Sequence, residues 1–198
     1  MLGVSVDQWK PEGPRWGALF ALVVAGEMVF FLPFVLARVF RPTFLEVFSL
    51  TNFELGTAFA LYGVVAMVSY FPGGVLADLL SPRKLLALAL VATSGGGLLL
   101  VCIPSLTSLK LLYAYWGFTT VALFWAALMR ATREWGGLTR QGAAFGLLDG
   151  GRGLLTAATA VVLVVLYASL IPDEAASATL EQRSAAFRWI IVLTAAMT

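Results

Sequence analysis

Long runs of apolar residues constrain this chain more than any other feature of its sequence. A run of about 20 apolar residues spans a hydrocarbon core of about 30 Å when it forms a helix. Only 12% of the 198 residues are charged and 60% are hydrophobic, whereas a soluble domain has about 25% charged residues. Because so few charged side chains cannot cover a globular surface in water, the sequence predicts a helical protein whose main solvent is the lipid bilayer.

The apolar runs predict five complete membrane helices and the beginning of a sixth. The sixth run is only about 13 residues long, which is too short to cross a membrane, so we expect the N-terminal part of a longer protein. The predicted fold class is all-α: a polytopic membrane helical bundle over residues 16–198, preceded by a polar cytoplasmic segment at residues 1–15. The predicted helices are Trp16–Phe40, Leu55–Leu80, Leu85–Ile103, Leu109–Met129, Phe145–Ile171 and a sixth from Ala185 to Thr198.

The distribution of Lys and Arg favours a cytoplasmic N-terminus, because cytoplasmic loops of membrane proteins carry an excess of these residues. With this orientation the inner side carries seven basic residues and the outer side five. We expect an integral membrane protein, of the bacterial inner membrane, with a cytoplasmic N-terminus. The inner set is Lys10, Arg15, Arg83, Lys84, Arg130, Arg133 and Arg140, and the outer set is Arg38, Arg41, Lys110, Arg183 and Arg188.

Several kinds of site are excluded by residues that the chain lacks. It has no histidine and a single cysteine, Cys102. An intrachain disulfide, a Ser-His triad and a His-based zinc site are therefore impossible. The formal net charge is only +2, and no basic run is interleaved with aromatic residues, so a nucleic-acid partner is not expected. We expect no metal, no cofactor and no enzymatic activity.

Three ionisable residues lie inside predicted membrane helices, where a charge costs at least about 2.5–3.5 kcal/mol. Glu27 lies eleven residues from Trp16 and eleven from Arg38, near the middle of the first helix. Asp149 and Arg152 are three residues apart near the start of the fifth helix, so they share a helix face. These residues are candidates for a substrate or coupling pathway.

Structural roles are open for each of them. Asp149 and Arg152 could form a local clasp that holds a glycine-rich turn. Glu27 has no opposite charge three or four residues away, so it is either a protonated acid hydrogen-bonded to a neighbouring helix or a carboxylate facing a water-filled cavity. Arg38 ends the first helix, and its default role is to reach the interface. Gly142, Gly146 and Gly150 form a stripe that allows close approach of another helix.

The connection between the second and third predicted helices has a distinctive pattern. Residues 73–84 read GGVLADLLSPRK. Gly74 precedes Asp78 by four residues, Pro82 turns the chain, and Arg83 and Lys84 begin the next helix. This pattern resembles the loop motif of the major facilitator superfamily, which has a glycine, three residues, an aspartate and then a basic pair. The chain departs from the family pattern at Leu79, where a basic residue is common, and at Ser81-Pro82, where a glycine is common.

The resemblance implies the N-terminal six-helix half of a twelve-helix secondary transporter that moves a small polar or anionic solute by alternating access. It implies that Gly74, Asp78, Arg83 and Lys84 form a cytoplasmic gate, that Arg38 is the nearest candidate for a substrate arginine, and that the partner is the missing C-terminal half. Proton coupling through Glu27 is a further expectation. Two alternatives stay open: a membrane-embedded enzyme that acts on lipid head groups, and a helical scaffold or sensor that transports nothing.

Overall fold

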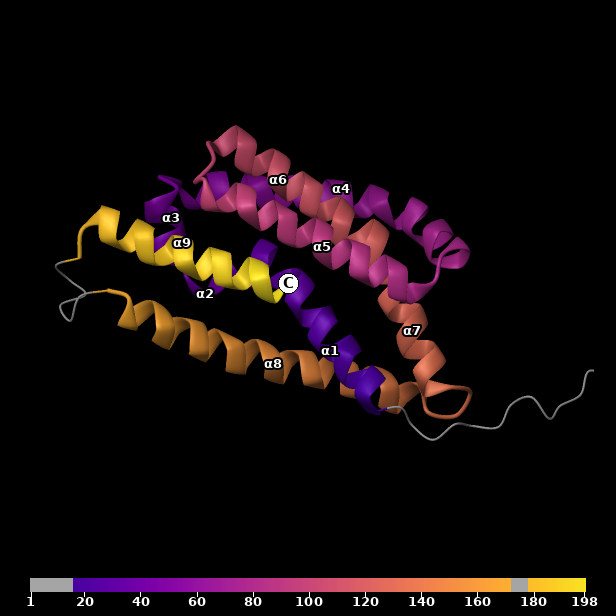
Figure 1. The fold of residues 1–198 in the computed structure, drawn as a ribbon. Helices are drawn as coiled ribbons and strands as arrows, with labels where there is room; N and C mark the ends of the chain where they lie inside the picture. The colour runs from indigo at the N-terminus through magenta and orange to yellow at the C-terminus, as the bar shows by residue number, and fades with distance from the viewer. Residues whose placement is uncertain (1–15, 172–177) are drawn as a thin grey trace, which may run out of the picture.

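The structure, a computed structural model, describes residues 16–171 and 178–198. Within these ranges every regular element is a helix, as Figure 1 shows. The polar segment predicted at residues 1–15 lies outside the described residues. Five helical stretches are long and apolar enough to cross a membrane, which confirms the predicted all-α bundle: Trp16–Val39, Asn52–Leu79, Pro82–Val101, Leu106–Gly136 and Gln141–Ser169.

Two of the five spans contain a π-helical turn, so each is divided into three elements. The first span consists of α1 (Trp16–Phe30), η2 (Phe31–Val35) and α2 (Leu36–Val39). The fourth consists of α6 (Leu106–Phe118), η3 (Thr119–Trp125) and α7 (Ala126–Gly136). Pro33 lies inside η2 and lacks the backbone N–H that a regular helix needs there. The remaining helices are α3 (Arg41–Val47), α4 (Asn52–Leu79), α5 (Pro82–Val101), α8 (Gln141–Ser169) and α9 (Leu180–Met197).

Helices begin before the apolar runs because polar residues cap them. Thr51 forms a reciprocal capping box with Glu54, so α4 begins at Asn52 rather than at the predicted Leu55. Thr179 forms the same arrangement with Gln182, so α9 begins five residues before the predicted Ala185. Hydropathy detects the apolar middle of each helix, whereas the cap determines its first residue.

The break after the first span also differs in detail from the prediction. The predicted first helix extends to Phe40, but the helix ends at Val39 and the chain turns at Phe40. Pro42 lies in the first turn of the short helix α3, where a missing N–H removes no helical hydrogen bond. The helix α7 continues to Gly136 rather than to the predicted Met129, and ends where Gly137 adopts a positive φ of 58°.

Helices distant in sequence pack side by side in Figure 1, with α4 beside α6, α1 beside α8 and α5 beside α9. The rings of Trp16 and Trp135 meet edge to face with centroids 5.6 Å apart, so α1 begins where α7 ends. We call this the Trp16 end of the bundle. At the opposite end, Arg183 of α9 donates to Glu46 of α3 over 2.8 Å.

Close approach between α4 and α6 depends on Gly117. A Cβ atom at this position would lie 2.6 Å from the backbone carbonyl oxygen of Tyr62. Hydrogen bonds satisfy the polar groups near this contact. The Tyr62 hydroxyl lies 2.6 Å from Thr120 Oγ1, and the Thr120 hydroxyl donates to the carbonyl oxygen of Trp116. By contrast, no atom would lie within 4 Å of a Cβ at Gly63 on the other side of α4.

We predict that Gly117→Ala destabilises the bundle by about 1–3 kcal/mol, the usual cost of overpacking. Gly63→Ala is the matched control, because it adds the same methyl group to a helix interior and meets only open space. The thermal unfolding midpoint of both purified variants in detergent measures the difference. Equal midpoints would contradict the assigned α4–α6 contact.

Candidate functional site

Glu27 is the most deeply buried ionisable side chain of the candidate site. Only 5% of the residue is exposed, although it lies in the middle of a membrane span. Among the described residues no group donates a hydrogen bond to its carboxylate. Its one charged neighbour within residues 16–171 and 178–198 is Arg152 of α8, whose Nε lies 3.7 Å from Glu27 Oε2. The charge partner that the sequence lacked within α1 therefore comes from the fifth span.

Arg152 lies between two carboxylates. Its Nη1 is 3.4 Å from Asp149 Oδ1, one turn earlier on α8. The Asp149 side chain is 71% exposed, whereas that of Arg152 is 18% exposed. The predicted Asp149–Arg152 pair is present, but it is not an isolated local clasp, because the same guanidinium also faces Glu27. Together Glu27, Asp149 and Arg152 form what we call the charge cluster.

Aromatic rings hold the Arg152 guanidinium in place. Its Cζ atom lies 5.5 Å from the ring centre of Phe30 and 5.9 Å from that of Trp125, both within the range of cation–π attraction. Phe30 is the last residue of α1 before η2, and Trp125 is the last residue of η3. The π-helical segment η2 therefore begins directly after one ring that contacts Arg152, and η3 ends at the other. π-helical turns occur frequently at functional sites.

The stem of Arg152 passes over Gly26. A Cβ atom at that position would lie 3.1 Å from Arg152 Cδ and 3.3 Å from a methyl group of Leu128. At Gly151, the residue of α8 that precedes Arg152, a Cβ would lie 2.9 Å from a Val23 methyl group. Two glycines thus allow α1 and α8 to approach closely enough for the Glu27–Arg152 contact.

The other predicted pathway residue, Arg38, lies apart from this cluster. It is an exposed side chain in α2, eleven residues beyond Glu27, or roughly 16 Å along the helix axis. No ion pair involves it among the described residues. The glycine stripe at Gly142, Gly146 and Gly150 also stands apart, since a Cβ at any of the three would meet no atom within 4 Å. In the part of the chain that the structure describes, no helix packs against this stripe.

The loop-motif residues lie at the Trp16 end of the bundle. Asp78 is one residue from the end of α4, and Arg83 and Lys84 lie in the first turn of α5. All three are exposed, and none of their side chains forms an ion pair or hydrogen bond with another described residue. Gly74 is open on its outer side, whereas a Cβ at its neighbour Gly73 would lie 3.0 Å from the backbone of Ala122. Gly73 therefore serves packing within the bundle, and Gly74 faces outward.

An arginine that was not among the predicted site residues contacts the end of α4. Arg130 of α7 donates to the carbonyl oxygen of Ala77, next to Asp78, and its Nε also lies 2.8 Å from Glu134. The Arg130–Glu134 spacing was visible in the sequence, but the contact with Ala77 joins residues 53 positions apart. No local pattern could have predicted it.

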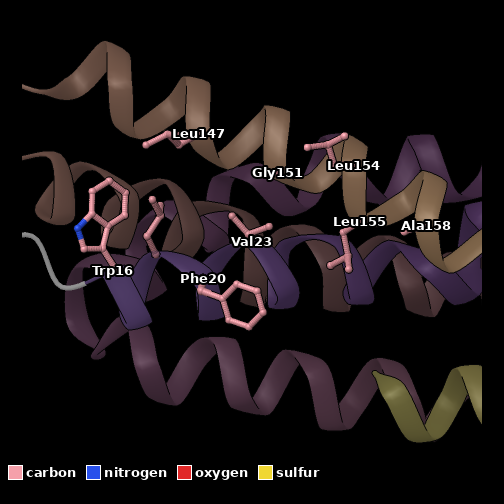
Figure 2. Close-up of a pocket in the computed structure, with 9 residues that line it drawn as sticks. Trp16, Phe20, Val23, Leu147, Gly151, Leu154, Leu155 and Ala158 are labelled. Carbon is pink, nitrogen blue, oxygen red and sulfur yellow. The ribbon is translucent and has the colours of Figure 1, made fainter.

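Two hollows flank α1 on opposite sides. Figure 2 shows the first, an apolar groove of about 540 Å³ between α1 and α8, with Phe20 and Val23 opposite Gly151 and Leu155. Asp149 is two residues from Gly151 and so projects from the other side of α8. The second hollow, of about 770 Å³, lies between α1, α5 and α7, and Arg83, Glu134 and Trp135 line it. Neither hollow is lined by a member of the charge cluster.

Comparison with known proteins identifies similar sequences. The sequence model of the Major Facilitator Superfamily matches residues 18–198. Inner membrane protein YqcE of Escherichia coli is 27% identical over 163 residues, which cover 82% of this chain and 38% of that protein. Inner membrane protein YihN of the same organism is 26% identical over 153 residues, covering 77% of this chain and 36% of that protein. The chain thus spans little more than a third of these relatives' length. No solved structure matches the chain.

The Glu27–Arg152 contact should appear as an energetic coupling. We predict that Arg152→Gln lowers the free energy of unfolding, because it leaves a buried carboxylate without a counter-charge. The double variant with Glu27→Gln should recover part of the loss, with a coupling of about 0.5–3 kcal/mol in a double-mutant cycle. Unfolding of the purified variants in mixed micelles provides the four free energies.

Asp149 supplies the matched control for that cycle. Its carboxylate faces the same guanidinium but is mostly exposed, so the Asp149→Asn and Arg152→Gln pair should couple by only about 0.2–1 kcal/mol. A coupling for Glu27 no larger than that for Asp149 would show that the buried contact contributes nothing beyond an exposed ion pair.

Proposed function

Because this chain belongs to the major facilitator superfamily, we propose that it forms the N-terminal half of a secondary active transporter. It is an integral membrane protein with five spans among its described residues. The proposed activity is movement of a small polar solute across the membrane by alternating access, with the N-terminus in the cytoplasm. The proposed partner is a C-terminal half that follows in the same chain.

The observation that carries this proposal is the charge cluster inside the first and fifth membrane spans. Ionisable residues at that depth are costly and mark solute or ion pathways in transporters. Here Glu27 and Arg152 come from the first and fifth spans, and Asp149 remains mostly exposed beside them. A purely structural ion pair does not need an exposed third charge. The proposal places the cluster on the polar pathway.

Open glycines on the outward faces of α4 and α8 support the proposal that a second half packs against this one. A Cβ at Gly56, Gly63 or Gly74 of α4 would meet no described atom within 4 Å, and the same holds for Gly142, Gly146 and Gly150 of α8. Open glycines in membrane helices favour close helix–helix packing. We propose that helices of the second half pack against α4 and α8, and slide there during alternating access.

Asp78, Arg83 and Lys84 are proposed to brace the gate at the Trp16 end. Their side chains are exposed and have no charged partner among the described residues, so they are available to groups on the second half. The carboxylate of Asp78 suits the positive N-terminus of another helix. Arg130 supports this end of α4 by donating to the carbonyl of Ala77.

The coding sequence beyond Thr198 tests the architecture directly. We predict that it continues with about six further apolar runs of about 20 residues each. A stop codon immediately after Thr198 would contradict the half-transporter assignment, and two copies of the chain would then have to assemble to form a pathway.

A variant of the gate residue tests the mechanism in the longer protein. We predict that Asp78→Asn lowers the initial uptake rate by about tenfold or more while membrane insertion stays normal, because the loss of a charged hydrogen bond costs about 1.5–3 kcal/mol. Glu181→Gln is the control, since it neutralises an exposed carboxylate in the first turn of α9, away from the gate residues. Normal uptake by the Asp78→Asn variant would refute the gate assignment.

A further inference from the structure

The last turn of α9 lies between α1 and α5, as Figure 1 shows. A Cβ at Gly97 of α5 would lie 2.7 Å from the Cβ of Ala195. Ser94, one turn nearer the Trp16 end of α5, donates to the carbonyl oxygen of Ala195 over 2.6 Å. Thr198 donates to the carbonyl oxygen of Met28 in α1 over 3.1 Å. These contacts hold α9 against both helices, about midway along each.

The second hollow begins where these contacts stop. On α5, Leu90 comes one turn after Ser94 toward the Trp16 end and lines the hollow. On α1, Ala25 comes one turn after Met28 in the same direction and lines the opposite side. The hollow therefore continues the groove that α9 already occupies. From the middle of the bundle to the Trp16 end, its lining includes Leu90, Leu86 and Arg83 on α5, and Ala25, Ala21 and Ala18 on α1.

The walls of the hollow suit a helix. Most of the α1 wall is alanine, and small residues in membrane helices let a neighbouring backbone approach closely. Polar side chains line the hollow only at its Trp16 end, where Ser81, Arg83, Glu134 and Trp135 lie. A polar solute would therefore find no partner along most of its depth. A lipid chain would suit apolar walls, but it would not explain why the walls continue the α9 contacts turn by turn.

Arg83 provides the matching charge at the mouth of the hollow. It lies in the first turn of α5, and its side chain has no partner among the described residues. The carboxylate at the mouth, Glu134, is already paired with Arg130 over 2.8 Å. The C-terminal end of a helix leaves four carbonyl groups without partners and carries a partial negative charge. Arg83 is therefore placed to bind such an end.

The length of the hollow agrees with a continued helix. From Ser94 to Arg83 is eleven residues of α5, or roughly 16 Å along its axis. A helix beside this stretch needs about eleven further residues, or about three turns. At present α9 has 18 residues, whereas α4 and α8 have 28 and 29. The extension would bring α9 to about the length of those two spans.

We infer that the second hollow is the seat of the residues that follow Thr198, which continue α9 as a helix to the Trp16 end, and that Arg83 binds the carbonyl oxygens at the end of that helix. This inference rests on the proposed function, because it requires the chain to continue toward a second half. It names the partner of Arg83 in the proposed gate, which is the end of the helix from which the chain leaves the first half. The hollow is then a packing surface and not a solute site.

Disulfide cross-linking of the longer protein in membranes tests the seat. In a Cys102→Ser background, Ala21→Cys or Ala87→Cys places a thiol on either wall of the hollow. Each is paired with single cysteines over about the first three turns after Thr198. The cross-link yield should peak at every third or fourth position, and the peaks for the two walls should be offset. Leu88→Cys is the matched control, because Leu88 is exposed beside Ala87 but does not line the hollow.

A labelling rate tests the role of Arg83. Ala18→Cys places a thiol on the α1 wall near the Trp16 end of the hollow. Arg83→Gln should raise the rate at which a water-soluble maleimide labels this thiol by about tenfold, because the last turn of the helix loses a charged hydrogen bond and frays. Lys84→Gln is the matched control, since Lys84 is an exposed cation in the same turn of α5 that does not line the hollow.

Three results would overturn the inference. Yields from Ala21→Cys and Ala87→Cys no higher than those from Leu88→Cys would show that the hollow has another occupant. Equal yields at every position after Thr198 would show that the segment there is not a helix. Equal labelling rates with and without Arg83→Gln would remove Arg83 from the helix end. A protein that transports its solute but fails to cross-link refutes this inference alone, whereas one that cross-links but does not transport refutes only the proposed function.

Discussion

The absence of water in the hydrocarbon core is the constraint on which the rest of this structure depends. Each backbone N–H and C=O group in the membrane needs a partner within the protein, and a helix provides one for nearly all of them. The two π-helical turns depart from this regularity only where protein covers them. Four of the five residues of η2 and five of the seven of η3 are buried. Irregular backbone thus occurs inside the bundle and not on its lipid-facing surface.

The same scarcity of water explains the arrangement around Arg152. Carboxylates, a guanidinium and aromatic faces are the groups that can stabilise one another when water is absent, and all three types meet where α1, η3 and α8 adjoin. Gly26 and Gly151 allow this meeting, because a side chain at either position would separate α1 from α8. Packing and electrostatics therefore reinforce each other: the glycines permit the contact, and the charges oppose any slip along the helix axes.

The bundle is packed unequally on its different faces. The first and fourth spans, which contain the π-turns, are the most buried, whereas the fifth is the least buried. Open glycines on α4 and α8 lie on exposed faces, and the Asp78 side chain at the end of α4 has no partner among the described residues. Exposed apolar surface is ordinary in lipid, but exposed glycines and unpaired charges are better explained by further protein. This asymmetry supports the proposal that a second half packs against these faces.

Sequence alone was sufficient to predict the membrane class, the five spans and the family, because each rests on local composition or short-range spacing. Run length predicts a span, and Gly74 with Asp78 and the basic pair indicates the loop motif. Helix starts were displaced by up to five residues, since polar caps such as Thr179 precede the apolar run. The sequence also identified Glu27, Asp149 and Arg152 as costly charges.

Only the tertiary structure decided that Glu27 pairs with Arg152, that Phe30 and Trp125 flank that cation, and that Gly73 packs while Gly74 stays open. These contacts join residues far apart in the chain, and their geometry depends on how helices rotate and cross, which helical periodicity within one segment does not determine.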